Sequence, residues 1–97
     1  MDNSINVTIL TGWLKADPDI RYTKEEKAVA HFTILSKGEP FDCVAFDGLA
    51  KIVGEYLKEG RLVAVEGKIQ IDIQGKTTIK VDNLQFLDNK YFKEGKL

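Results

Sequence analysis

Residues 65–81, VEGKIQIDIQGKTTIKV, alternate apolar and polar side chains on both sides of one glycine, Gly75. Alternation with a period of two is typical of a half-buried β-strand, and a glycine between two such runs is typical of a hairpin turn. If the loop is residues 74–76, Ile71 lies opposite Ile79 and one face of the hairpin is consistently apolar. A two-residue loop would put the apolar residues on opposite faces. The stretch therefore predicts a β-hairpin with a three-residue loop.

The other face of this hairpin is polar and mildly basic. Its side chains are those of Lys68, Gln70, Asp72, Thr78 and Lys80. A solvated outer surface is the simplest interpretation, because antiparallel sheets commonly leave one face in water. A surface that binds an anionic partner is the alternative, and the choice between the two depends on the rest of the chain.

Five stretches of the chain are rich in β-branched and apolar residues and are predicted strands. They cover residues 5–14, 28–35, 41–46, 61–73 and 77–87. The polar stretch between the first two, ADPDIRYTKEEK at residues 16–27, contains a proline and is predicted to be a turn-rich connection.

The segment DGLAKIVGEYLKEG, residues 47–60, changes to a three-to-four spacing of apolar residues. This spacing predicts a helix with Asp47 as its N-cap and Gly60 just past its end. Five strands with one helix between the third and fourth is the element order of the OB-fold, a partly open five-stranded Greek-key barrel. We therefore expect an all-β OB-fold domain over residues 1–87, followed by a short polar tail at residues 88–97.

Composition limits the classes of function that fit this chain. With 97 residues and 43% hydrophobic content, it forms one small domain, and its net charge of −1 means that any site for a polyanion must be local. Cys43 is the only cysteine and His31 the only histidine, so we expect no internal disulfide, no metal site and no cofactor. The chain has no apolar run long enough for a membrane span and no signal-peptide pattern, which predicts a cytoplasmic protein.

Three long segments carry a resemblance to a known family. They are ILTGWLKADPDIRYTKEEKAVAHFTI, CVAFDGLAKIVGEYLKEGRLVAVEGKIQ and VDNLQFL. In order and spacing they resemble the bacterial-type single-stranded DNA-binding proteins over residues 5–87. The resemblance implies a domain that coats single-stranded DNA without sequence preference during replication, recombination or repair. It also implies a homo-oligomer, a dimer or tetramer, in the cytoplasm and associated with the nucleoid.

The sequence departs from the family pattern in three places. The short stretch SKGEP, residues 36–40, joins two predicted strands where the family usually has a long loop with basic and aromatic residues. Asp42 stands where the family often has a basic or polar residue, and the hairpin at 65–81 has no aromatic residue. The end of the chain, residues 89–97, lacks the acidic, hydrophobic tip of many family members. The chain is thus predicted to be a minimal or tail-less form with fewer stacking rings.

Nonspecific binding of single strands requires cations for phosphates and exposed rings for base stacking. The predicted stacking residues are Trp13, Phe41 and Phe46, and the predicted phosphate contacts are Lys15, Arg21, Lys37, Lys68, Lys76 and Lys80. Phe46 matches the family's DNA-facing aromatic residue, while Trp13 stands where the family is usually polar or basic. Core packing is the alternative for each ring, and a solvated charge is the alternative for each cation. Tyr22 and Phe32 are expected to pack, and His31 to lie on an exposed strand face.

The hairpin carries cations but no ring, so it is predicted to contact phosphates rather than to stack bases. The first strand suggests self-association, because it is apolar on both faces, with Val7 and Ile9 on one side and Leu10 and Leu14 on the other. One barrel cannot easily bury both faces, and a second copy could cover the outer one.

An enzyme finds little support in this sequence, and no catalytic residue or small-molecule substrate is predicted. GKTT at residues 75–78 is similar to the end of a phosphate-binding loop, but Gln70 stands where that motif needs glycine, and a strand follows instead of a helix. The alternative to DNA binding is therefore an OB-fold protein-interaction module, such as a primosome-type accessory, with weak nucleic-acid binding.

Overall fold

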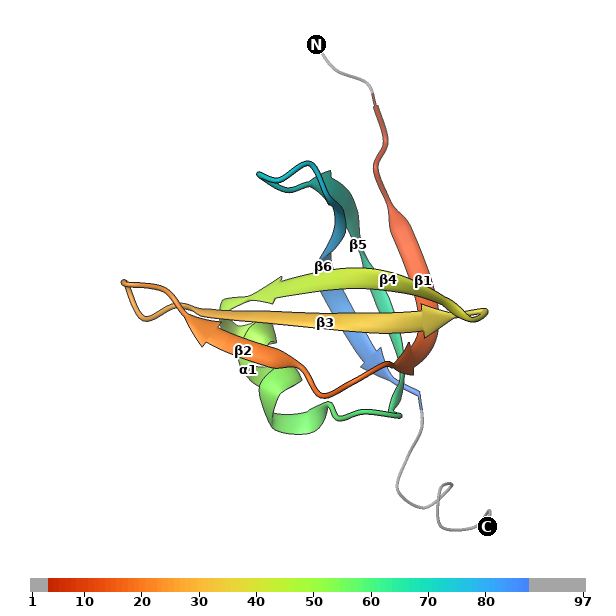
Figure 1. The fold of residues 1–97 in the computed structure, drawn as a ribbon, viewed down its shortest axis with the longest axis horizontal. Helices are drawn as coiled ribbons and strands as arrows, with labels where there is room; N and C mark the ends of the chain where they lie inside the picture. Colours follow the sequence, from red (N-terminus) through yellow and green to blue (C-terminus); the bar gives the residue numbers. More distant parts are fainter. Residues whose placement is uncertain (1–3, 88–97) are drawn as a thin grey trace.

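The computed structural model describes residues 4–87, so the predicted tail at 88–97 lies outside the described residues (Figure 1). The elements are β1 (Thr8–Leu14), β2 (Asp19–Tyr22), β3 (Ala28–Ser36), β4 (Glu39–Phe46), α1 (Asp47–Tyr56), β5 (Leu62–Ile71) and β6 (Thr77–Phe86). All five predicted strands and the predicted helix are present. No helix in this part of the chain is long and apolar enough to cross a membrane.

The strands form one sheet in the order β1-β5-β6-β4-β3-β2, and an additional pairing of β1 with β3 closes it into a barrel. All neighbours are antiparallel except β4 and β6, which are parallel over two residue pairs. Figure 1 shows β3 and β4 crossing in front of β1, β5 and β6, with α1 at one end. This topology confirms the expected OB-fold.

The core lies between the inner faces of the strands and α1. On β3 the alternation of residues puts Ala28, Ala30, Phe32 and Ile34 inside, and the helix adds Ala50, Val53 and Leu57. Phe32 is buried as expected. Cys43 is also buried, where it acts as a small apolar side chain.

The stretch at 16–27 is more regular than predicted. Asp19–Tyr22 forms the short strand β2, which pairs with the start of β3 so that Asp19 lies opposite His31 and Tyr22 opposite Ala28. A four-residue edge strand is too short to show a clear alternation of residues. The polar composition of this stretch therefore predicted a turn-rich connection instead. The prediction that Tyr22 packs is wrong, because it ends this strand beside the projecting turn at residues 23–27 and is 64% exposed.

The predicted N-cap of the helix is also wrong. Phe46 is the N-cap residue, with extended backbone and no side-chain hydrogen bond, and Asp47 is the first helical residue with φ of 56°. An N-cap needs the extended conformation that Phe46 has, so the Asp47 carboxylate is not placed to cap the helix. The helix ends at Tyr56, and Gly60 lies farther on in the following turn with φ of 88°.

The β5–β6 hairpin has the predicted faces but not the predicted register. Ile71 lies opposite Thr77, and Ile69 opposite Ile79, so the loop is residues 72–76 rather than 74–76. Asp72 explains the longer loop, because its carboxylate accepts hydrogen bonds from the backbone N–H groups of Gln74 and Lys76. The shift of two residues keeps every side chain on its predicted face.

A β-bulge interrupts the same ribbon nearer the barrel. The register of β5 against β6 shifts between Glu66 and Gly67. A Cβ atom on Gly67 would overlap the backbone carbonyl oxygen of Lys80. The close approach of the two backbones therefore requires glycine at this position.

Candidate nucleic-acid interface

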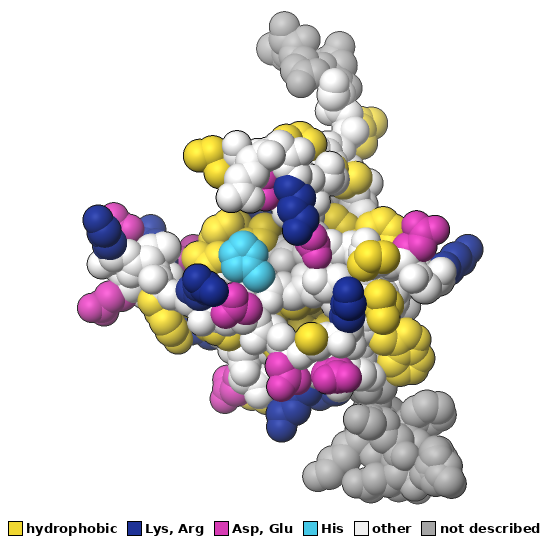
Figure 2. Space-filling view, in the orientation of Figure 1, with side chains coloured by type: hydrophobic (Ala, Val, Ile, Leu, Met, Phe, Trp, Pro, Cys, Tyr) yellow, Lys and Arg dark blue, Asp and Glu magenta, His cyan; other side chains and the backbone are white. Residues whose placement is uncertain are grey.

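The outer faces of β3 and β4 form a continuous surface, which we call the platform. Because side chains alternate along a strand, the residues between the buried ones all point outward. The platform consists of the facing pairs Val29 and Phe46, His31 and Val44, Thr33 and Asp42, and Leu35 and Pro40. His31 is exposed, as expected, and its cyan colour marks this side of the molecule in Figure 2.

One end of the platform combines a ring with two cations. Phe46 is 39% exposed, and the Lys80 ammonium lies 5.9 Å from the centre of its ring. Lys80 is paired with Val44 across the β4–β6 seam, and it lies directly opposite Lys68 on β5. Like charges at directly opposite positions destabilise a sheet, so an anion placed between these lysines would relieve their repulsion.

The other end of the platform carries Trp13, which is 53% exposed. It lies opposite Leu35 where β1 meets β3, and Leu35 in turn faces Pro40. From Leu35 to Val29 the strand advances roughly 20 Å at about 3.3 Å per residue. The two exposed rings, Trp13 and Phe46, therefore stand at opposite ends of one surface.

A cleft of about 370 Å³ lies beside the middle of the platform. Its lining includes Lys15, Asp17, Asp19, His31, Thr33, Asp42, Asp72, Gln74, Lys76 and Thr78. These residues come from the β1–β2 connection and the first residue of β2, from the platform, and from the hairpin loop and the start of β6. The loop therefore forms one wall of the cleft.

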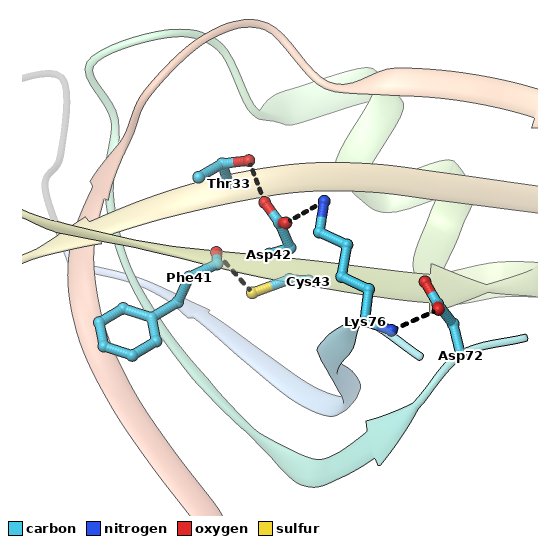
Figure 3. Close-up of polar contacts among 6 residues, drawn as sticks. All are labelled: Thr33, Phe41, Asp42, Cys43, Asp72 and Lys76. Carbon is cyan, nitrogen blue, oxygen red and sulfur yellow. Dashed lines mark hydrogen bonds and ion pairs between the residues drawn. The ribbon is translucent and has the colours of Figure 1, made fainter. Parts of the chain in front are cut away.

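Asp42 and Lys76 form an ion pair across this cleft (Figure 3). The Lys76 ammonium lies 2.6 Å from one carboxylate oxygen of Asp42, and the Thr33 hydroxyl donates a 2.8 Å hydrogen bond to the other. The hydrogen bond from Lys76, followed by that from Thr33, lowers the pKa of Asp42 below its ordinary value. The same contact with Asp42 raises the pKa of Lys76.

The structure brings most of the predicted site residues to this side of the molecule but not all of them. Lys15 and Lys76 line the cleft, and Arg21 lies on β2 with its guanidinium 3.1 Å from the Asp19 carboxylate. Lys37 lies in the turn between β3 and β4, outside the cleft. Phe41 is on the inner face of β4, where it packs against the core.

Phe41 instead lines a separate apolar groove of about 330 Å³. The other residues of this groove are Thr8, Leu10, Pro40, Asp42, Ile69, Thr77, Thr78 and Ile79. The ring of Phe41 therefore does not share a face with Phe46, because the two residues are five positions apart along the strand and an odd offset puts them on opposite faces.

Sequence reasoning did not single out Thr33, Thr78 or Asp19 as site residues. The signal for Thr33 was available, because it alternates with buried Phe32 and Ile34 and so must face outward with His31. The hydroxyl oxygen of Thr78 is buried and has no hydrogen-bond partner among the described residues. The alternation of residues places Thr78 on the polar face of the hairpin, but it does not predict that its hydroxyl is buried.

Metal binding and the chemistry of the Cys43 thiol each depend on how side chains are placed among the described residues. Residues 4–87 contain no group of three or more His, Cys, Asp or Glu side chains placed to hold a metal ion. Burial raises the pKa of the Cys43 thiol to about 12, so it is protonated at neutral pH and a poor nucleophile.

Residues 5–87 match the family described as the single-strand binding protein family. The chain belongs to that family. Among relatives of the single-strand binding protein family, the single-stranded DNA-binding protein of Oceanobacillus iheyensis is 33% identical over 89% of this chain, which spans 65% of that protein. Single-stranded DNA-binding protein 1 of Synechocystis is 30% identical over 90% of this chain, which spans 87% of that protein.

Solved structures of similar proteins have the same fold. The wild-type single-stranded DNA binding protein from Thermus aquaticus superposes with a TM-score of 0.82 at 25% identity, over 92% of this chain and 44% of that one. An SSB domain from Synechococcus, at 19% identity, gives a TM-score of 0.77 over 88% of this chain and 99% of that one. The fold expected for the single-strand binding protein family is therefore confirmed.

The connection between β3 and β4 is short. Ser36 lies opposite Glu39, and only Lys37 and Gly38 separate them, with φ values of 53° and 80°. Positive φ at both central residues is typical of the tight hairpin turns that match strand twist. The predicted direct connection is confirmed, and the surface available to a ligand here is the platform itself rather than a long loop.

Proposed function

We propose that this protein binds single-stranded DNA without sequence preference and acts in DNA replication, recombination or repair. The observation that carries the proposal is the cluster of Phe46, Lys80 and Lys68 at one end of the platform. The ring offers a face on which a base stacks, and the facing lysines hold a phosphate next to it. Binding, rather than catalysis, is the chemistry that these residues provide.

A surface that places an exposed ring next to cations favours the binding of a single strand over a duplex. Bases in a duplex hide their faces, whereas unpaired bases can stack on an exposed ring. Because the net charge of the chain is −1, attraction by bulk charge is weak and the local lysines must supply the salt-dependent part of the affinity. Lys15 and Arg21 extend the cationic surface along the platform, and Trp13 offers a second ring at its far end.

We also propose that the protein is a homo-oligomer, located in the cytoplasm with the nucleoid. Val7 and Ile9, on the outer side of the first strand and the segment before it, are exposed, whereas Leu14 on the inner side is buried. A second copy that covers the outer side would bury apolar surface that a single barrel leaves in water. Light scattering that gives only the monomer mass would contradict this part of the proposal.

The test is a titration of fluorescent oligo-dT with the protein at several salt concentrations. Replacing Lys68 and Lys80 by glutamine should weaken binding and flatten the dependence of log K on log salt by about 1.4, or about 0.7 for each lost phosphate contact. The matched control replaces Lys51 and Lys58, which lie on α1 and just after it, and should change the slope much less.

Replacement of Phe46 by alanine should weaken binding by about 1 to 3 kcal/mol without changing the salt slope, because it removes stacking and no charge. Equal affinity of the wild-type protein for duplex and single-stranded oligonucleotides would overturn the proposed function. An unchanged salt slope in the Lys68 and Lys80 double variant would show that the polar face of the hairpin is only solvated surface.

A further inference from the structure

Asp42 is the only acidic side chain on the platform. It lies on the same face of β4 as Phe46, in the middle of the surface along which a polyanion would run. An unpaired carboxylate at this place would repel phosphates. Its charge is balanced in the free protein by Lys76, whose ammonium lies 2.6 Å away.

Hydrogen bonds on the platform and in the hairpin loop hold Asp42 and Lys76 in place for their contact. The Thr33 hydroxyl fixes one oxygen of the Asp42 carboxylate, leaving the other for Lys76. On the hairpin, Asp72 accepts hydrogen bonds from the Gln74 and Lys76 backbones, and the Asp72 N–H donates to the Lys76 carbonyl. Figure 3 shows the Lys76 side chain extending from this loop toward β4.

A carboxylate oxygen and a phosphate oxygen are equivalent partners for an ammonium group, since both are anionic acceptors of charge-assisted hydrogen bonds. The ammonium has three N–H donors but one positive charge, so Lys76 gives a phosphate of the bound strand its full interaction only by leaving Asp42. This exchange replaces one ion pair by another and leaves the Asp42 carboxylate without its cation on a surface that now holds a polyanion. Lys76 thus gains less from an arriving strand than a lysine without an ion-pair partner would.

We propose that Asp42 is a built-in competitor for the phosphates of the bound strand, holding Lys76 across the cleft and weakening the binding of single-stranded DNA. The inference rests on the proposed function and deepens it, because it names one acidic residue that lowers the affinity of the same site for single-stranded DNA. In the free protein, the contact between Lys76 and Asp42 joins the hairpin loop to the platform.

The test is the variant Asp42→Asn in the same oligo-dT titration. The amide keeps the shape of the side chain and can still accept the hydrogen bond from Thr33, but it no longer pairs with Lys76 as an ion. Binding at low salt should become about 2- to 10-fold tighter. The slope of log K against log salt should steepen by about 0.7, because Lys76 becomes a full phosphate contact.

Two controls separate this mechanism from a general change of charge. Glu55→Gln on α1 changes the net charge equally and should leave the slope unchanged. In a Lys76→Gln background, Asp42→Asn should no longer steepen the slope, and Lys76→Gln alone should cost less affinity than Lys80→Gln. If Asp42→Asn has the same effect with and without Lys76, simple repulsion is responsible and the proposal is overturned.

A measurement without DNA tests the contact itself. The pKa of the Asp42 carboxyl, followed by NMR, should rise in Lys76→Gln, and an unchanged pKa would overturn the proposal. If no variant binds oligo-dT even at low salt, the proposed function fails and this inference with it. If the wild-type protein binds but the slope of Asp42→Asn is unchanged, only the inference about Asp42 fails.

Discussion

The base and the tip of the β5–β6 ribbon share one pattern of alternation but differ in burial. At the base, Val65 and Ile79 are no more than 4% exposed, whereas at the tip Ile71 is 65% and Ile73 fully exposed. All four are apolar residues at alternate positions of the same hairpin. Alternation of apolar and polar residues therefore identifies the apolar face of a strand, but it does not show whether another part of the protein covers that face.

The difference has a geometric cause. The base pairs with β1 on one side and with β4 on the other, so its inner face closes the barrel. Beyond Gly67, β5 no longer pairs with β1, and the ribbon continues past the barrel to the loop capped by Asp72. Figure 1 shows this part extending away from the crossing strands. The apolar residues of the tip are exposed because nothing among residues 4–87 lies over them.

The largest effect is expected for the stability of the fold, when one isoleucine at the base and one at the tip of the same ribbon face are each replaced. Ile79→Ala should destabilise the fold by about 2 to 5 kcal/mol, because it leaves a cavity in the core. Ile71→Ala should change the free energy of unfolding by no more than about 0.5 kcal/mol. Chemical denaturation monitored by circular dichroism measures both. A similar loss for the two variants would contradict the comparison and show that a second copy covers the tip in solution.

A smaller effect is expected from the glycines. Gly67→Ala should destabilise the protein by about 1 to 3 kcal/mol, because its Cβ overlaps the Lys80 carbonyl oxygen and the strands must separate. Gly48→Ala is the matched control, since a Cβ there meets nothing within 4 Å and the residue lies in α1. It should be neutral or stabilise the helix by up to about 1 kcal/mol. Thermal unfolding of the two variants would distinguish them.

The mildest test leaves the fold intact and compares the reactivity of thiols. Cys43 lies opposite Ile79 at the base and is 2% exposed, with a pKa raised by burial to about 12. The native protein should therefore resist a maleimide reagent. Ile73→Cys places a second thiol at the exposed tip and should add one rapidly labelled site, counted by mass spectrometry. Rapid labelling of Cys43 in the native wild-type protein would show that the base opens locally.

Much of this fold was predictable because its main elements have strong local patterns. The change from period two to a three-to-four spacing placed α1 between β4 and β5, and alternation put Phe32 inside and His31 outside. The short strand β2 was missed because it has four edge residues, of which only Ile20 is partly buried, and so carries almost no pattern. The hairpin register was missed by two residues because the decisive contact is the side chain of Asp72 bonding its own loop.

The site was predicted less completely than the fold. Phe46, Lys68 and Lys80 were named separately, and the structure places them together because β4 and β6 pair at Val44 and Lys80. The ion pair between Asp42 and Lys76 joins residues far apart in sequence, and no local pattern predicts it. Phe41 was grouped with Phe46, although their positions on β4 give them opposite faces, so this error could have been avoided from the sequence alone.

The short β4–β6 seam has a consequence for the order of folding. The β3–β4 and β5–β6 hairpins each close a short loop. The seam instead joins Val44 to Lys80, which are 36 positions apart in the sequence, with only two residue pairs. Long loops cost more entropy to close, so we expect the hairpins to form first and the seam to form late. Because Phe46 belongs to one hairpin and Lys80 to the other, a partly folded chain has each half of the cluster but not the cluster itself.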